Sequence, residues 1–284
     1  MTTSRPPFDL EAGSSDFYRD PTYYEYEFKD RAADARFYVD RYVAYTKAHE
    51  DARHAEPGGK GDTVLELGVG AGRIALKAVR KGAKVLGLDI TQAMLVEADA
   101  RREKLPKSRQ PHLKLVRGDM RHFAFGRKFG LITCPFNAFQ HLYTRPDVEA
   151  CLASVAASLA PDGRFILDVL VPDLEYLVRP AFKRYPGVRF KHPTHNIDYL
   201  YSEQSAYDAV AQINQMWFHY DRAEPSKTAP AYDCIQLSHR CFFPQELEAL
   251  LHYNGFAIEE AFGDFESGPL TPDSDSQILV CKRR

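Results

Sequence analysis

A glycine-rich segment near residue 70 constrains the fold of this chain most strongly. A short apolar run, Val64 to Leu67, is followed by three glycines at alternate positions, Gly68, Gly70 and Gly72, and then by apolar residues at helical spacing. This order predicts a strand, a tight turn and a helix. Glycine tolerates positive φ and lets a ligand approach the backbone, and the amide groups that open the helix point outward. The turn therefore suits an adenosine-type cofactor.

An acidic residue at the end of the next apolar run supports this interpretation. Asp89 lies 21 residues after Gly68, where a carboxylate can accept hydrogen bonds from both ribose hydroxyls. A dinucleotide-binding turn would need a small residue at position 73, and this chain has Arg73 there. The sequence therefore disfavours a nicotinamide oxidoreductase.

The segment Glu66–Arg73 resembles motif I of the class I S-adenosylmethionine-dependent methyltransferases. The resemblance continues with Asp89, with Gly118-Asp119-Met120 after the third expected strand, and with Pro135-Phe136-Asn137 after the fourth. It covers residues 60–170 well and the rest of the chain loosely. It implies an α/β fold, a Rossmann-like seven-stranded sheet with helices on both faces and a closing antiparallel hairpin. It also implies S-adenosylmethionine as cofactor and S-adenosylhomocysteine as product.

The resemblance implies a set of cofactor-binding residues at the strand ends and in the aromatic amino-terminal segment. They are Tyr24, Glu66, Gly68, Gly70, Gly72, Arg73, Asp89, Ile90, Met94, Asp119, Met120 and Pro135. In the family the residue at the position of Asp119 accepts the exocyclic amino group of adenine, and the next side chain packs on the ring. The alternative for an aspartate after a strand is a helix cap.

The residues after the fourth expected strand are candidates for the acceptor site. Ligands of open α/β sheets lie beyond the carboxyl ends of the strands, where the strand order switches, so Asn137, Gln140 and His141 should face the transferred methyl group. His141 is the candidate catalytic base or orienting residue, and a structural role is equally expected for it. Tyr23 is a further candidate for acceptor binding. Methyl transfer from a sulfonium is a direct in-line displacement, which asks the protein for positioning, desolvation and, for some acceptors, a base.

The remaining sequence divides by composition. Residues 1–16 are polar and rich in Pro, Gly and Ser, which predicts disorder. Aromatic residues crowd the segment 17–60, which predicts a helical cap whose rings either pack in the core or cover the cofactor. Residues 171–243 alternate in polarity and predict an antiparallel β-rich lid inserted into the fold. Residues 61–170 and 244–284 are expected to form the S-adenosylmethionine-binding domain.

Two side chains of the expected lid are candidates for acceptor binding. Trp217 and His219 lie two positions apart, and therefore on the same face of a strand. An indole wall beside an imidazole suits a small and partly polar acceptor. In the alternative, Trp217 anchors the lid to the sheet.

Composition narrows the classes of partner. A net charge of −2 and a pI near 6.6 give no general attraction to nucleic acid, which favours a small-molecule acceptor. The five cysteines are scattered and form no C-x-x-C, so neither disulfides nor a zinc site is expected, and the chemistry requires no metal. No apolar run has the length of a membrane span, and the amino terminus lacks the apolar core of a signal peptide. We therefore expect a cytoplasmic protein without a membrane partner, either a monomer or a homodimer.

These observations predict an S-adenosylmethionine-dependent methyltransferase that acts on a small molecule. Two alternatives remain open, a methyltransferase of RNA or protein and a non-catalytic protein that binds S-adenosylmethionine. The sequence leaves open the identity of the acceptor, and whether its nucleophile is oxygen, nitrogen or carbon.

Overall fold

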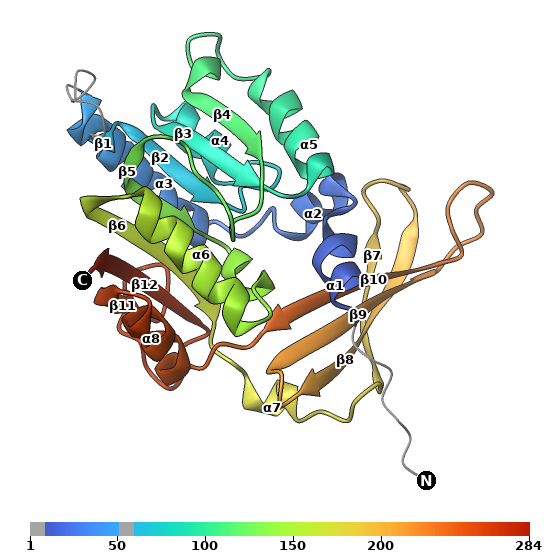
Figure 1. Ribbon diagram of the computed structural model, residues 1–284. Helices are drawn as coiled ribbons and strands as arrows, with labels where there is room; N and C mark the ends of the chain where they lie inside the picture. Colours follow the sequence, from blue (N-terminus) through green and yellow to red (C-terminus); the bar gives the residue numbers. More distant parts are fainter. Residues whose placement is uncertain (1–8, 51–59) are drawn as a thin grey trace. The chain divides into compact units, whose positions relative to one another are not determined.

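The chain folds into two compact units (Figure 1), as seen in a computed structural model that describes residues 9–50 and 60–284. The larger unit consists of Phe28–Pro172 and Phe242–Arg284. The smaller unit consists of the described residues up to Glu27 and of Asp173–Cys241. The expected domain boundaries near residues 171 and 243 thus lie close to two places where the chain passes from one unit to the other.

The larger unit is built on a sheet with the strand order β11-β12-β6-β5-β2-β3-β4 (Figure 1). The strands are β2 (Thr63–Leu67), β3 (Lys84–Asp89), β4 (Leu113–Arg117), β5 (Lys128–Cys134), β6 (Leu159–Leu170), β11 (Phe256–Phe262) and β12 (Ser276–Arg283), and the short β1 (Lys60–Gly61) pairs with β5. The first five of these pair in parallel, and β12 is antiparallel to both β6 and β11. The order switches between β2 and β5, so this structure confirms the expected seven-stranded α/β sheet and the expected place of the switch point.

Apolar side chains cover both faces of this sheet. Along β2, Val64 contributes to one hydrophobic cluster and Leu65 to the other, because successive side chains of a strand point to opposite faces. The cluster with Val64 includes residues of three helices, α3, α4 and α5. The cluster with Leu65 includes residues of α6 and α8. The helices of this unit are α3 (Ala33–Ala48), α4 (Ala75–Arg80), α5 (Gln92–Arg102), η3 (Gln110–His112), η4 (Ala138–His141), α6 (Arg145–Ser158) and α8 (Pro244–Tyr253).

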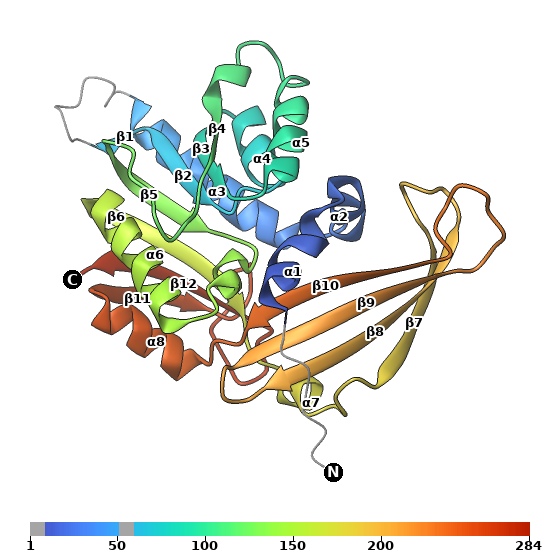
Figure 2. The ribbon, with the colours of Figure 1, turned by 45° about the vertical axis from the view of Figure 1, so that its right-hand side comes forward.

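The smaller unit contains a four-stranded antiparallel sheet with the order β10-β9-β8-β7 (Figure 2). Its strands are β7 (Arg184–Lys191), β8 (Asp198–Asp208), β9 (Ile213–Arg222) and β10 (Tyr232–Arg240), and its helices are α1 (Leu10–Ser15), η1 (Asp16–Tyr18), α2 (Pro21–Glu27) and α7 (Leu174–Leu177). Helix α1 packs along β10, as Figure 2 shows. The turn η1 also contacts β10. The antiparallel insertion expected from the alternating sequence is therefore present.

The amino-terminal segment differs from the expectation in two ways. Part of the stretch expected to be disordered is helical, because Asp9 caps α1 by accepting a hydrogen bond from the Ala12 amide at 2.9 Å; residues 1–8 lie outside the described residues. The aromatic segment 17–60 does not form one cap. Helix α2 belongs to the smaller unit, whereas α3 belongs to the larger unit, where it buries Tyr38 and Tyr42 completely. Residues 51–59 of this segment lie outside the described residues.

Candidate active site

The glycine turn adopts the conformation that its sequence predicts. Gly68, Gly70 and Gly72 have φ values of 69°, 53° and 80°, which side chains larger than hydrogen disfavour. The amides of Gly68 and Val69 donate to the Leu88 carbonyl at 2.8 and 3.1 Å, and this fixes the turn to β3. A Cβ atom on Gly68 would lie only 2.7 Å from the Cβ of Ala138, so the turn approaches the segment after β5 closely.

Asp89 lies beside this turn, as the sequence analysis expected. Its Oδ2 accepts a hydrogen bond from the Gly70 amide at 2.7 Å, and its Oδ1 accepts one from the Thr91 amide at 2.8 Å. Burial raises the pKa of Asp89, although the backbone donors oppose this effect. Each carboxylate oxygen can accept more than one hydrogen bond, so Asp89 keeps acceptor capacity for ribose hydroxyls.

Glu66 provides the strongest test of whether the site fits the expected cofactor. Its side chain is 2% exposed, and burial raises its pKa to about 8, against the lowering effects of a hydrogen bond with Tyr42 and of the charge on Arg73. Among the described residues, its buried Oε2 has no hydrogen-bond partner. An unsatisfied carboxylate oxygen at the end of β2 fits a cationic donor. The amino acid moiety of S-adenosylmethionine carries such a group, so these residues fit the cofactor.

Arg73 is held by contacts within the larger unit. Its guanidinium forms an ion pair with Asp34 at the start of α3, and Nη1 also donates to Asp34 Oδ1 at 3.2 Å and to the Arg31 carbonyl at 3.4 Å. It lies over the ring of Phe136, 4.1 Å from the ring centroid. The ion pair is more than nine-tenths buried. Arg73 therefore links the glycine turn to α3 and to the segment after β5, and its contact with the cofactor stays a prediction.

The segment after β5 is held in an unusual backbone conformation. Phe136 and Asn137 are consecutive non-glycine residues with φ values of 58° and 61°. Their amides donate to Asp168 Oδ1 at 2.8 Å and Oδ2 at 3.1 Å, and the Tyr38 hydroxyl donates to Asp168 Oδ1 at 2.5 Å. Left-handed backbone at such residues costs on the order of 1–3 kcal/mol each, and Asp168 compensates part of this cost. Burial raises the pKa of Asp168 to about 6, against these three hydrogen bonds.

Sequence reasoning did not assign a role to Asp168 or Tyr38. The available signal was weak, an acidic residue near the end of the apolar run that becomes β6. All of its partners precede it in the chain, Asn137 and Phe136 by 31 and 32 residues and Tyr38 by 130 residues. The structure thus adds a buried carboxylate that positions the segment carrying the candidate acceptor residues.

The other two candidates after β5 lie in or next to the turn η4. Gln140 is buried, and its Oε1 accepts a hydrogen bond from the Leu170 amide at 3.3 Å. His141 is half-buried, and its Nδ1 lies 3.1 Å from the Tyr143 hydroxyl. Burial lowers the pKa of His141 to about 4. The imidazole is therefore neutral at physiological pH, which is the state that a general base requires.

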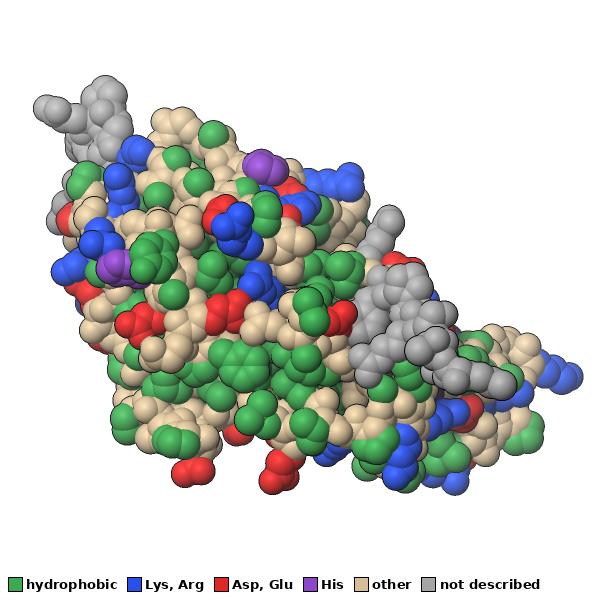
Figure 3. Space-filling model, turned by 60° about the horizontal axis from the view of Figure 1, so that its bottom comes forward, with side chains coloured by type: hydrophobic (Ala, Val, Ile, Leu, Met, Phe, Trp, Pro, Cys, Tyr) green, Lys and Arg blue, Asp and Glu red, His purple; other side chains and the backbone are tan. Residues whose placement is uncertain are grey.

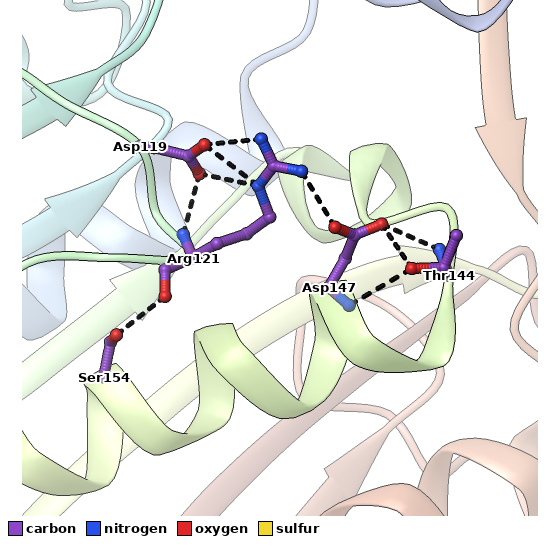
Figure 4. Close-up of polar contacts among 5 residues, drawn as sticks. All are labelled: Asp119, Arg121, Thr144, Asp147 and Ser154. Atoms are coloured by element: carbon purple, nitrogen blue, oxygen red, sulfur yellow. Dashed lines mark hydrogen bonds and ion pairs between the residues drawn. The ribbon is translucent and has the colours of Figure 1, made fainter.

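Asp119 lies in a polar network that joins the segment after β4 to α6 (Figure 4). Arg121 donates to both of its carboxylate oxygens through Nε, at 3.0 and 2.9 Å, and through Nη2 at 2.6 Å. The Nη1 of Arg121 donates to Asp147, whose carboxylate also takes part in a capping box with Thr144. Burial acts to raise the pKa of Asp119, but the bonds from Arg121 outweigh it and lower the pKa. Contact with adenine stays a prediction, which requires Asp119 to accept a hydrogen bond in addition to those from Arg121.

The remaining cofactor candidates lie around the same turn. Met94 on α5 is buried, with its Cε 3.5 Å from the position of a Cβ on Gly70. Ile90 follows Asp89 and is 55% exposed, Met120 packs against the hydrophobic cluster that includes α6, and Pro135 is buried. The structure therefore groups the glycine turn with Asp89 and Met94, and the assignment of individual contacts to the cofactor stays a prediction.

Two aromatic candidates lie in the smaller unit. Tyr23 on α2 is buried, donates to Glu27 Oε2 at 3.1 Å and accepts from the Tyr220 hydroxyl at 2.9 Å. Tyr24 is also buried and packs edge-on against Phe17, with ring centroids 6.0 Å apart. Both therefore pack within this unit, and their proposed contacts with the acceptor and the cofactor stay predictions.

Trp217 and His219 share a face of β9, as the spacing predicts. His219 lies within hydrogen-bond distance of Gln204 Oε1, at 2.8 Å, and of the Tyr232 hydroxyl, at 2.6 Å. Trp217 is half-buried and packs against Phe182, with ring centroids 5.5 Å apart. These contacts lie within the smaller unit, so the acceptor wall and the anchoring role both stay predictions.

Residues 9–50 and 60–284 contain neither a cluster of metal ligands nor a helix that could span a membrane. No group of three or more His, Cys, Asp or Glu side chains could hold a metal ion there. In the same ranges, no helix combines the length and the apolar character needed to cross a bilayer.

Comparison with known proteins identifies relatives of this chain. A family model described as "Methyltransferase domain" matches residues 64–163. A Bacillus subtilis protein, named as the methyltransferase YqeM, is 28% identical over 77% of this chain and 82% of its own length. The dTDP-3-amino-3,6-dideoxy-alpha-D-glucopyranose N,N-dimethyltransferase of Streptomyces fradiae is 33% identical, over 38% of this chain and 40% of its own. The solved structure of the CcbJ methyltransferase from Streptomyces caelestis shares the fold, with a TM-score of 0.73 at 19% identity over 90% of this chain and 98% of its own.

Proposed function

We propose that this chain, which belongs to the class I S-adenosylmethionine-dependent methyltransferases, methylates a small-molecule acceptor. Its cofactor is S-adenosylmethionine, which supplies an electrophilic methyl group when bound. The observation that carries the assignment is the glycine turn flanked by Asp89 and by the unsatisfied carboxylate oxygen of Glu66.

Each residue of the site has a role that follows from its chemistry. We propose that Asp89 accepts hydrogen bonds from the ribose hydroxyls and that Glu66 pairs with the cationic amino group. Asp168 holds the backbone of Phe136 and Asn137, which keeps the segment that carries His141 in one conformation. His141 then orients the acceptor or accepts its proton.

Two observations support a small acceptor over a nucleic acid. The protein has 37 Lys and Arg residues against 39 Asp and Glu residues, and both signs are interspersed on the face drawn in Figure 3. The Streptomyces fradiae relative, by its name, acts on a nucleotide-linked amino sugar, which is a small molecule. Methylation of RNA or protein and binding without catalysis are the alternatives that the experiments below separate.

The cofactor assignment is tested by Asp89→Ala. The variant loses charge-assisted hydrogen bonds to ribose, worth about 1.5–3 kcal/mol each before compensation by water, so calorimetry should show at least about tenfold weaker binding of S-adenosylmethionine. Asp99→Ala is the matched control, because Asp99 is a half-exposed aspartate on α5 that pairs with Arg102. Equal affinities of the two variants would contradict the role of Asp89.

The acceptor class is tested with methyl-labelled S-adenosylmethionine and a cell extract separated into protein, RNA and low-molecular-mass fractions. We expect label in the low-molecular-mass fraction. Label only in RNA or protein would establish the macromolecular alternative, and its absence from every fraction would favour a binding protein.

We also propose a cytoplasmic location. Support comes from the five cysteines, none of which forms a disulfide within the chain, as is usual in a reducing compartment. Whether the protein is a monomer or a homodimer stays a prediction that sedimentation can test.

A further inference from the structure

A polar cluster surrounds Glu203 on the sheet of the smaller unit. Oε1 of Glu203 accepts a hydrogen bond from the Tyr176 hydroxyl of α7, and Oε2 accepts one from the Tyr201 hydroxyl at 3.1 Å. Side chains alternate along a strand, so Tyr201, Glu203 and Ser205 share one face of β8. We call Tyr176, Tyr201, Glu203, Ser205 and Asn214 the Glu203 cluster.

Asn214 on the neighbouring strand β9 completes the cluster, and its side chain brings a hydrogen-bond acceptor that has no donor in the described part of the chain. The residue pairs with Tyr207 of β8, which places it on the same face as Glu203, and its amide is hydrogen-bonded to Tyr176. Its side chain is only 6% exposed, yet among the described residues its Oδ1 has no hydrogen-bond partner. A buried acceptor without a donor costs about 1–3 kcal/mol, and a ligand that supplies an N–H or O–H would recover this energy.

Aromatic rings and a second carboxylate continue the same face. Tyr220 pairs with Tyr201 across β8 and β9, with ring centroids 5.7 Å apart, and Tyr23 packs edge-on against Tyr220 at 5.4 Å. The Tyr23 hydroxyl donates to Glu27. The pKa values of Tyr23 and Tyr201 are raised, mainly by burial and to a smaller extent by the neighbouring carboxylates and tyrosines. These hydroxyls therefore remain protonated and keep the carboxylates hydrogen-bonded.

The charges on this face favour one kind of ligand. The side chains Glu203 and Glu27 carry negative charge, and the faces of tyrosine rings attract cations. The guanidinium of Arg179 stacks on the Tyr176 ring, 4.7 Å from the centroid. Farther along this face, Arg19 forms an ion pair with Asp233, which pairs with Tyr220 across β9 and β10. A neutral hydroxyl would satisfy Asn214 without matching the two carboxylates, whereas a protonated amine satisfies both requirements.

We infer that the Glu203 cluster binds the amino group of the acceptor, so that the substrate of this methyltransferase is a small amine. The inference rests on the proposed function and narrows its substrate class. In this arrangement Glu203 pairs with the charged nitrogen, Asn214 Oδ1 accepts one of its hydrogens, and the ring of Tyr201 contacts the carbon skeleton beside it.

The direct test compares ligands that differ in one group. Tyramine and glucosamine carry an amine where tyrosol and glucose carry a hydroxyl, and calorimetry with the S-adenosylhomocysteine-saturated protein measures their affinities. We expect at least one amine to bind at least about tenfold more tightly than its hydroxyl counterpart, which is the range of one charge-assisted hydrogen bond. Equal affinities within both pairs, or no binding by either amine, would overturn the inference.

Two variants locate the binding. Glu203→Gln should weaken binding of the preferred amine at least about tenfold. Asn214→Leu, which keeps the number of side-chain heavy atoms and removes the acceptor, should weaken it by a smaller factor. Glu175→Gln is the matched control, an exposed glutamate adjacent to Tyr176, and should leave amine affinity unchanged. Unchanged S-adenosylmethionine affinity verifies that each variant is folded. If Glu203→Gln and Asn214→Leu both bind the amine like the wild type, the cluster only ties α7 to the sheet.

Failure of the inference is distinguishable from failure of the proposed function. Transfer of labelled methyl groups to small molecules that lack an amine would refute the amine site and leave the methyltransferase assignment intact. Absence of label from all small molecules would refute the proposed acceptor class itself.

Discussion

The buried ion pair between Arg73 and Asp34 yields the most quantitative prediction. The two side chains are 7% and 6% exposed, so water screens neither charge. In Asp34→Asn the guanidinium keeps its bond to the Arg31 carbonyl and its place over Phe136, but it loses its counter-charge. Removal of one partner of a buried pair typically costs about 3–5 kcal/mol, because the other charge stays buried without compensation. We expect this loss in the free energy of unfolding.

The assay is a double-mutant cycle measured by urea unfolding. Arg73→Met should cost about as much as Asp34→Asn, and the double variant should cost less than the sum of the two, since it buries no isolated charge. The matched control is Asp40→Asn, also on α3, which removes an ion pair with Lys81. Both side chains of this pair are about 60% exposed. Exposed pairs of this kind contribute about 0–1 kcal/mol.

A small effect would refute this reasoning. If Asp34→Asn destabilises the protein no more than Asp40→Asn, the Arg73 guanidinium binds water or another acceptor in the variant. The buried ion pair between the glycine turn and α3 then contributes less to the free energy of unfolding than we expect. Additive costs of the two single substitutions would lead to the same conclusion, because additivity means that the side chains do not interact.

Two further predictions concern titrating groups. Burial raises the pKa of Glu66 to about 8, above the ordinary 4.5. The contribution of Glu66 to the free energy of unfolding is therefore fully present below pH 4.5 and is lost as the pH rises through about 8. The free energy of unfolding of Glu66→Gln, measured in urea, should lack this pH dependence. Pairing with the cofactor's amino group should ionise Glu66, so calorimetry near pH 7 in buffers of different ionisation enthalpy should detect release of about one proton in the wild type and less in Glu66→Gln. The second prediction rests on the pKa of His141, lowered to about 4: the pH profile of turnover should show no His141 inflection above about pH 5, and His141→Asn should lower turnover about 10²- to 10⁴-fold with unchanged cofactor affinity. Normal turnover of this variant would make His141 a structural residue.

The parts of the site that sequence reasoning predicted are local in the chain. The glycine turn needs only the order of strand, glycines and helix, and Asp89 follows from the end of the next apolar run. Hydrophobic periodicity likewise predicts the sheet, because each strand carries its own signal. The start of β6 shows the limit of such signals. Pro161-Asp162-Gly163 predicts a turn before a strand at residue 164, but the strand begins at Leu159 and continues through these residues.

The division of the aromatic amino-terminal segment could not be predicted in this way. Tyrosine at helical spacing indicates an amphipathic helix without naming the surface that buries it. The structure separates the two candidates by their partners, since Tyr23 bonds to Tyr220 on β9 and Tyr42 to Thr133 on β5. Only the complete fold decides which sheet each tyrosine contacts.

The backbone after β5 shows why the remaining part of the site depends on distant residues. Phenylalanine has no intrinsic preference for positive φ, so nothing in the sequence at Phe136 predicts its conformation. The conformation exists because contacts from outside the segment hold it. Asp168 binds the two amides, and Arg73 lies over the ring, so a residue of the cofactor turn and a residue at the end of β6 converge on the segment that carries His141. A change in the position of Arg73 should therefore reach the acceptor side of the site through Phe136, without any direct contact between Arg73 and the acceptor.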